Sequence, residues 1–169
     1  AIHLLRERHG ESVPIVFVGS SHDSTDVVDR LVGELGVEGL VFRLGYVPEK
    51  DLVALYRAAT ALVFASFADY TNIPVLEAMA LGTPVACSNV FAMPEQVGAA
   101  GLLFDPHDEA DMAAKMLLLW QDDELRKRLV TAGYERVKDL SSANFIDSWA
   151  LIIRDVLAES KSTVEPVSD

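Results

Sequence analysis

The chain has 169 residues, 50% of them hydrophobic, which is enough for one domain with a buried core and excludes a disordered chain. The formal net charge of −12 argues against nucleic acid as the main partner, because phosphate backbones need a basic surface. The single cysteine, Cys87, excludes an internal disulfide and fits the reducing cytoplasm.

Apolar runs alternate with amphipathic stretches over the first hundred residues. Pro74 suits the first turn of a helix and Gly82 suits the residue after its end. Strand–helix alternation with short connections is typical of an α/β, doubly wound parallel sheet with helices on both faces. Hydrophobic periodicity predicts strands at 14–19, 39–45, 61–65, 84–87 and 101–104, and helices at 1–10, 24–35, 49–58 and 74–81.

The pattern changes near residue 108, after which no further strand is expected. Periodicity predicts three consecutive helices over 109–120, 122–138 and 143–159. The tail is rich in Ser, Glu and Asp and is expected to be disordered. We therefore expect one domain over 1–160 and a disordered tail over 161–169.

The opening helix, 1–10, has no strand before it, whereas a doubly wound domain normally begins with one. We therefore expect the chain to begin inside a domain and to lack its first strand. That strand is central in the order 3-2-1-4-5-6. Without it, either strands 14–19 and 61–65 pair directly, or another chain fills the gap, and the unpaired edges offer a route to self-association.

The stretch DYTNIPVLEAMALGTPV, at 69–85, places Asp69 in a loop and Glu77 in the following helix. Each acid has an ordinary structural interpretation: Asp69 as a turn residue, and Glu77 as a favourable acid in the first turn of a helix. Glu95, after Pro94, also has an ordinary structural interpretation, as a residue at the start of a short helix. No His, Cys and Asp cluster has the spacing of a metal site, so none is predicted.

The region from Leu40 to His107 resembles the C-terminal domain of group 1 glycosyltransferases, retaining enzymes with two Rossmann-like domains in the GT-B fold. The segments that carry the resemblance are VFRLGYVPEKDLVALYRAATALVFAS, ASFADYTNIPVLEAMALGTPV and MPEQVGAAGLLFDPHD. It implies the donor-binding half of an enzyme that transfers a hexose from a UDP-, GDP- or ADP-linked sugar, with no cofactor. A missing N-terminal Rossmann-like domain would be the partner, would supply the site for an unknown acceptor, and would provide any peripheral contact with a membrane.

The resemblance also assigns roles to residues. Glu77 would accept the hydroxyls of the nucleotide ribose, and Asp69 would contact hydroxyls of the donor hexose. A carboxylate can accept two such hydrogen bonds without a metal, and a helix N-terminus suits a phosphate. The remaining expected binding residues are Tyr70, Thr71, Asn72 and Ile73, through backbone N–H groups that meet phosphate and hexose; Tyr46 and Val47, against the base; and Glu95, at the border of the site.

The sequence departs from the family pattern at two points. Asp69 replaces a Glu that is one methylene longer, and the usual glycines after it are missing, although Asn72 tolerates the left-handed backbone region. In the family, an Arg and a Lys after the first strand of this domain neutralise the diphosphate, and their counterparts would precede Ala1. We therefore expect this chain by itself to bind nucleotide weakly and to transfer no sugar. Two other functions remain open: a sugar-nucleotide epimerase of the same architecture, and a non-catalytic nucleotide- or protein-binding module.

Overall fold

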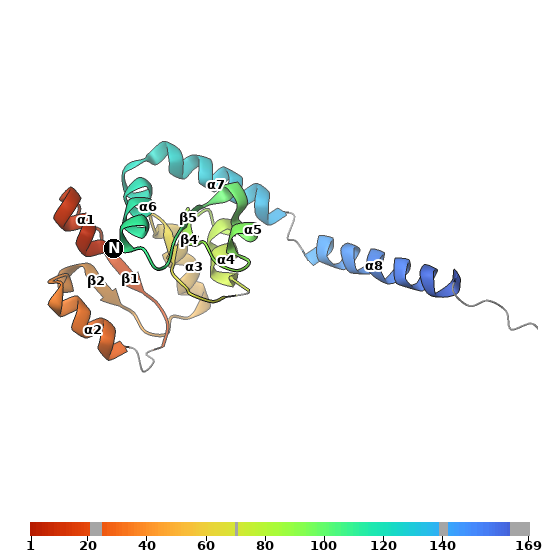
Figure 1. Cartoon of the computed structure of the whole chain (residues 1–169), viewed down its shortest axis with the longest axis horizontal. Helices are drawn as coiled ribbons and strands as arrows, with labels where there is room; N and C mark the ends of the chain where they lie inside the picture. Colours follow the sequence, from red (N-terminus) through yellow and green to blue (C-terminus); the bar gives the residue numbers. More distant parts are fainter. Residues whose placement is uncertain (21–24, 70, 139–141, 163–169) are drawn as a thin grey trace, which may run out of the picture.

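The computed structural model describes residues 1–20, 25–69, 71–138 and 142–162. Within these ranges all five expected strands are present, each close to its expected place (Figure 1). The α/β class is therefore confirmed. The strands are β1 (Ile15–Phe17), β2 (Val41–Arg43), β3 (Leu62–Phe64), β4 (Val85–Ser88) and β5 (Leu102–Phe104).

The helices also follow the predicted order, and local signals explain several of their ends. Gly10 ends α1 with a φ of 69°, a conformation that favours glycine. Asp108 caps α6 by accepting the N–H groups of Ala110 and Asp111. The helices are α1 (Ile2–His9), α2 (Thr25–Glu34), α3 (Glu49–Ala58), α4 (Ile73–Ala80), α5 (Met93–Val97), α6 (Glu109–Gln121), α7 (Asp123–Lys138) and α8 (Ser142–Ser162).

The strands form two separate parallel sheets. One has the order β1–β2 and the other the order β3–β4–β5. No pairing joins β1 to β3 among the described residues, and no other strand of those residues lies between them. Direct pairing of the two strands, one of the two expected outcomes of a missing central strand, therefore does not occur.

Strand β4 is the middle of the main core, because its side chains alternate between two helical layers. Val85 and Cys87 pack with residues of α4 and α5, while Ala86 packs on the opposite face with Phe104 of β5 and with α6 and α7. Helices therefore cover both faces of the β3–β4–β5 sheet, as expected (Figure 1). Cys87 is the small core side chain that its neighbours predict, and burial raises the pKa of its thiol to about 12.

Helix α7 lies close against α4, the helix that carries Glu77. Gly133 of α7 faces α4, and a Cβ added there would lie 3.4 Å from Met79, about an ordinary van der Waals contact. Gly82, just after α4, has a φ of 78°, and an added Cβ there would overlap the hydroxyl of Tyr134.

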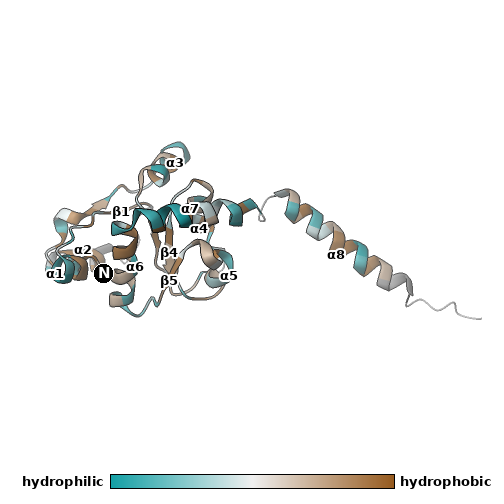
Figure 2. Ribbon diagram, turned by 90° about the horizontal axis from the view of Figure 1, so that it is seen from above, coloured by the Kyte–Doolittle hydropathy of each residue, from teal (hydrophilic) through white to brown (hydrophobic). Residues whose placement is uncertain are grey.

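Helix α8 projects away from the rest of the chain (Figure 1). Its apolar residues recur at helical spacing, and Phe145, Trp149, Ile152 and Val156 are all exposed (Figure 2). None of the helices in the described ranges is both long and apolar enough to cross a bilayer. The helix continues to Ser162 and so includes the first two residues of the expected tail, whose remainder, 163–169, lies outside the described residues.

Candidate functional site

The candidate site is the loop from β3 to α4, at the carboxyl end of β3. Ligands bind at this edge in open parallel sheets. The N–H of Ser66 donates to Oγ of Ser88 over 3.0 Å, which fixes the beginning of the loop to the end of β4. The loop is therefore tied to β4, the most completely buried of the described strands.

Asp69 organises the loop through its own carboxylate. Its Oδ1 accepts the backbone N–H of Thr71 at 3.0 Å, the N–H of Asn72 at 3.1 Å and the Thr71 hydroxyl at 3.3 Å. This is the contact pattern of a turn-forming Asp, and the short side chain favours it. Two of the N–H groups expected to meet phosphate and hexose, those of Thr71 and Asn72, thus bond to Asp69. Tyr70 lies outside the described residues.

Asn72 joins the loop to α4 in the left-handed region, with φ 48° and ψ 34°. The tolerance of Asn for this region, expected from sequence, is confirmed, and it explains how the loop turns without glycine. The side chain is fully buried, and neither of its amide atoms has a hydrogen-bond partner among the described residues. Ile73 follows as the first residue of α4 and is exposed.

Glu77 lies just beyond the first turn of α4. The helix begins at Ile73 and its first turn contains no acid, so the interpretation of Glu77 as a first-turn acid is wrong. The exposed carboxylate accepts a hydrogen bond from the Tyr56 hydroxyl of α3, with Oε2 at 3.2 Å. Such a carboxylate can still accept bonds from two vicinal hydroxyls.

Tyr56 keeps its proton at neutral pH and so remains a donor to Glu77. Burial raises the pKa of Tyr56 to about 12, and the charge and hydrogen bond of Glu77 act in the same direction. The sequence predicts only that Tyr56 lies within the helix at 49–58. Its pairing with Glu77 joins two helices and has no local sequence signal.

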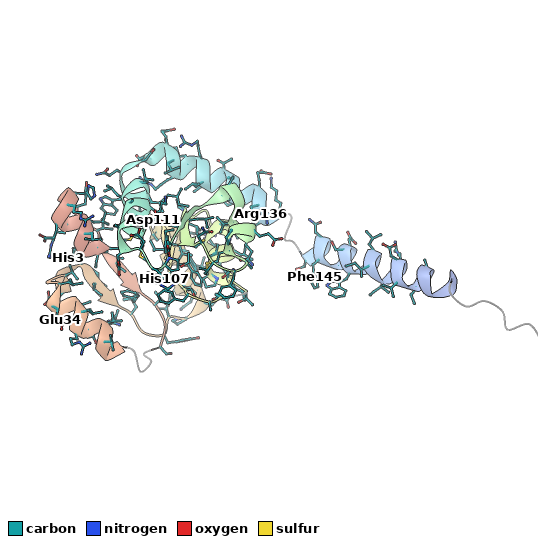
Figure 3. The ribbon with its side chains drawn as sticks, viewed as in Figure 1. His3, Glu34, His107, Asp111, Arg136 and Phe145 are labelled. Carbon is teal, nitrogen blue, oxygen red and sulfur yellow. The ribbon has the colours of Figure 1, made fainter. Side chains whose placement is uncertain are left out.

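Gln96 and Arg136 hold the loop from the side of α5 and α7, and sequence reasoning missed both. Gln96 donates from Nε2 to the carbonyl of Thr71 over 3.0 Å. Arg136 donates to the carbonyls of Gln96 (2.8 Å) and Glu95 (2.7 Å), and Figure 3 labels it on α7. Glu95 is exposed in the first turn of α5, as its ordinary interpretation expects. The loop is therefore supported through contacts that reach α7.

The loop after β2 carries the other expected residues. Gly45 has a φ of 64°, and its carbonyl accepts the N–H of Gly19 over 2.8 Å, which ties the ends of β1 and β2 together. Tyr46 is 79% exposed and Val47 is half-buried. The structure therefore brings Asp69, Thr71, Asn72, Ile73 and Glu77 together on one loop and helix, and places Tyr46 and Val47 on the neighbouring sheet.

No group of three His, Cys, Asp or Glu side chains among the described residues could hold a metal ion. His107, labelled in Figure 3, instead packs its ring against Phe67, with 4.8 Å between the centroids. What the site offers is an exposed carboxylate held by a phenol, and a second carboxylate beside the start of a helix. These carboxylates can accept hydrogen bonds from the hydroxyls of a polyhydroxylated ligand.

Comparison with known proteins gives a family match over residues 1–136, to the family described as glycosyl transferases group 1. The O-antigen chain mannosyltransferase B of Escherichia coli is 41% identical over 131 residues, which are 78% of this chain and 34% of that protein. The D-inositol 3-phosphate glycosyltransferase of Thermobifida fusca (strain YX) is 30% identical over 148 residues, which are 86% of this chain and 34% of that protein. The chain thus spans about a third of the length of these relatives.

Solved structures show the same architecture. A sucrose-phosphate synthase from Thermosynechococcus elongatus superposes with a TM-score of 0.73 at 26% identity, over 85% of this chain and 38% of that one. The C-terminal domain of a glycosyl transferase group 1 family protein (LpcC) from Francisella tularensis gives 0.70 at 24% identity, over 80% of this chain and 73% of that one. The sequence match and the fold agree, and the chain belongs to the glycosyl transferases group 1 family.

Proposed function

We propose that this chain holds the nucleotide-sugar donor of a hexosyltransferase that retains the anomeric configuration. The observation that carries the proposal is Glu77, an exposed carboxylate held by Tyr56 on the helix that follows a strand-end loop. The family match and the names of the relatives support it, and a mannosyltransferase among them favours a hexose donor. A structural neighbour, Anabaena Alr3699/HepE, was solved in complex with UDP and glucose.

In this proposal the two acids serve different ends of the donor. Glu77 accepts the ribose hydroxyls, and Asp69 contacts the hexose. Oδ1 of Asp69 already accepts bonds from Thr71 and Asn72, so this oxygen would have to serve both the loop and the hexose. We therefore expect the nucleotide end to contribute more binding free energy than the hexose end.

The rest of the reaction belongs to the longer protein in this proposal. An N-terminal Rossmann-like domain would supply the acceptor site and positive charge to stabilise the leaving diphosphate. No metal or organic cofactor is proposed, because carboxylates and backbone N–H groups bind hydroxyls and phosphates directly. The reaction is placed in the cytoplasm, a compartment that also suits the single buried thiol.

Calorimetric titration of this chain with UDP, GDP and ADP, with and without a linked hexose, tests the proposal. One nucleotide should bind in preference to the others. Glu77→Gln should weaken it about tenfold or more, because a charged acceptor contributes about 1.5–3 kcal/mol. Tyr56→Phe should cause a smaller loss, since the phenol only orients Glu77.

The matched control is Glu124→Gln, which removes another exposed helical carboxylate, paired with Lys127 on α7. Its affinity should equal that of the parent chain. Binding of none of the three nucleotides by the folded parent chain would contradict the proposal. So would equal affinities for the Glu77→Gln and Glu124→Gln variants.

A further inference from the structure

Three buried side-chain atoms of the described residues have no hydrogen-bond partner, and all three adjoin one peptide bond in the loop from β3 to α4. They are Oδ1 and Nδ2 of Asn72 and Oε1 of Gln96. Asn72 also has a positive φ of 48°. Unpaired polar atoms and an unusual backbone both oppose folding, and they persist where the surrounding structure holds them in place. The peptide that joins Thr71 to Asn72 therefore points to a constraint from function.

That peptide is held from both of its sides. The Thr71 carbonyl accepts a hydrogen bond from Nε2 of Gln96 at 3.0 Å, and the Asn72 N–H donates to Oδ1 of Asp69 at 3.1 Å. The C=O and N–H of a trans peptide point in opposite directions, so fixing the direction of one fixes the other. Gln96 therefore sets the direction in which the N–H of Asn72 meets the carboxylate of Asp69.

The positive φ of Asn72 depends on this orientation of the peptide. Turning the peptide over would reverse the sign of that φ and would point the Thr71 carbonyl toward the carboxylate of Asp69, where two oxygens repel each other. Asn tolerates the left-handed region but does not prefer it. The hydrogen bond from Gln96 therefore stabilises the backbone conformation in which Asp69 is bound by the loop.

Gln96 projects from a firmly held helix. Met93 and Val97, on either side of it along α5, are fully buried and pack in the main core with α4. Helix α5 has only five residues, but the carbonyls of Glu95 and Gln96 accept hydrogen bonds from Arg136 of α7 (Figure 3), and a cation suits this end of a helix. Gln96 can therefore hold the loop without moving itself.

The amide of Gln96 contributes little to folding by itself. Its Nε2 makes the hydrogen bond to the loop, and its Oε1 is buried with no partner among the described residues. A buried unpaired oxygen offsets the stability that the hydrogen bond provides. An apolar side chain of the same length would fill the space without the unpaired atom. The amide is therefore better explained by its effect on the loop than by stability.

We propose that Gln96 is a positioning residue for the hexose end of the donor. The inference rests on the proposed function, in which Asp69 contacts the hexose and Glu77 the ribose. Gln96 acts through the peptide between Thr71 and Asn72, which holds the carboxylate of Asp69 in one orientation. A carboxylate held in this way loses less freedom when it binds a hydroxyl. Binding of the hexose therefore depends on Gln96, and binding of the ribose does not.

The first measurement needs no ligand. In NMR, the three-bond coupling between the amide and Cα protons of Asn72 reports its φ, and hydrogen exchange reports the bond from its N–H to Asp69. Gln96→Met keeps the length of the side chain and removes the donor. It should change the coupling and speed exchange at Asn72 about fivefold or more, the factor of one neutral hydrogen bond, while circular dichroism stays unchanged.

Gln96→Glu is a second variant, of nearly the same shape, that replaces the donor by an acceptor. It should change the coupling of Asn72 in the same direction as Gln96→Met. The matched control is Gln121→Met, which removes another helical glutamine amide, one that donates to Glu11. Its coupling and exchange at Asn72 should equal those of the parent chain. An unchanged coupling in both folded Gln96 variants would overturn the proposal.

The second measurement uses the nucleotide that the parent chain binds best, free and linked to glucose or to mannose. The ratio of the two dissociation constants isolates the contribution of the hexose. Gln96→Met should weaken binding of the linked nucleotide about fivefold more than binding of the free nucleotide. Glu77→Gln should weaken both to the same extent, and Gln121→Met should weaken neither.

Two results of the titration would overturn the proposal. One is a loss in Gln96→Met that is equal for the two ligands or larger for the free nucleotide. The other is a parent chain that binds the nucleotide equally well with and without a hexose. A folded parent chain that binds no nucleotide would contradict the proposed function instead, and the coupling of Asn72 without ligand still tests Gln96 separately.

Discussion

The two sheets of this molecule have the same strand chemistry but very different packing. In the β3–β4–β5 half, β4 is fully buried and packs on helices from both sides. In the β1–β2 half, Val16, Phe17 and Phe42 are 49%, 47% and 50% exposed. Apolar strands are therefore not sufficient for a core, since each sheet also needs covering layers and neighbouring strands.

The proposed donor-binding loop, which runs from β3 to α4, is built on the well-packed β3–β4–β5 half. Its contacts run to β4 through Ser88, to α5 through Gln96, and from there to α7 through Arg136. The loops after β1 and β2 belong to the open half, where the described contacts are fewer. The difference predicts where substitutions should unfold the chain and where they should be tolerated.

The largest expected effect compares one substitution in the two halves. Phe104→Ala in β5 removes a ring that is 1% exposed and should cost about 3–5 kcal/mol of unfolding free energy. Phe17→Ala in β1 removes a ring that is nearly half exposed and contacts Arg43, so it should cost less than half as much. Urea denaturation measures both, and equal costs would remove the distinction between the halves.

The next effect is a pH dependence that belongs to the packed half. The thiol of Cys87 has a pKa of about 12 in the folded chain against an ordinary value of 9.0. The contribution of the neutral thiol to the free energy of unfolding is therefore complete below pH 9 and is lost as the pH rises toward 12. The loss should be about 2 kcal/mol between pH 9 and 10.5.

Cys87→Ala is the control for this pH dependence. It should lower stability at neutral pH, but its stability should fall less steeply above pH 9 than that of the parent chain. Denaturation curves at several pH values give both slopes. Parallel slopes would show that the thiol does not titrate as its burial implies.

The smallest effect separates backbone strain from close packing. Gly82 and Gly10 both have positive φ, 78° and 69°, but an added Cβ meets Tyr134 only at position 82. Gly10→Ala should cost about 1 kcal/mol from strain, and Gly82→Ala about 1–3 kcal/mol more from overlap. Thermal unfolding compares the two, and equal losses would mean that the Tyr134 side chain moves aside at little cost.

The sequence was sufficient for the order of strands and helices, because periodicity and glycine or proline at element ends are local signals. It was also sufficient for the unusual backbone of Asn72. The supports of the site were not predictable in the same way. The bonds of Tyr56 to Glu77 and of Gln96 to Thr71 join separate elements, and neither residue type nor spacing indicates such a pair.

The position of Glu77 shows how a small boundary error changes an interpretation. The helix was expected to start at Pro74 and in fact starts one residue earlier. The acid therefore falls outside the first turn, where the helix dipole would explain it. The sequence also gave no indication that β1 and β2 are exposed, because their apolar residues are typical of a buried strand.

The rate at which the single thiol, Cys87, is chemically labelled reports how often the packed half opens. The thiol is fully buried in β4, so a thiol reagent can label it only when the middle of the packed half opens. The labelling rate then counts openings of the layer beneath the donor loop, without any engineered probe. A ligand that stabilises the packed half would lower this labelling rate, and the decrease would measure how strongly the ligand and that half are coupled.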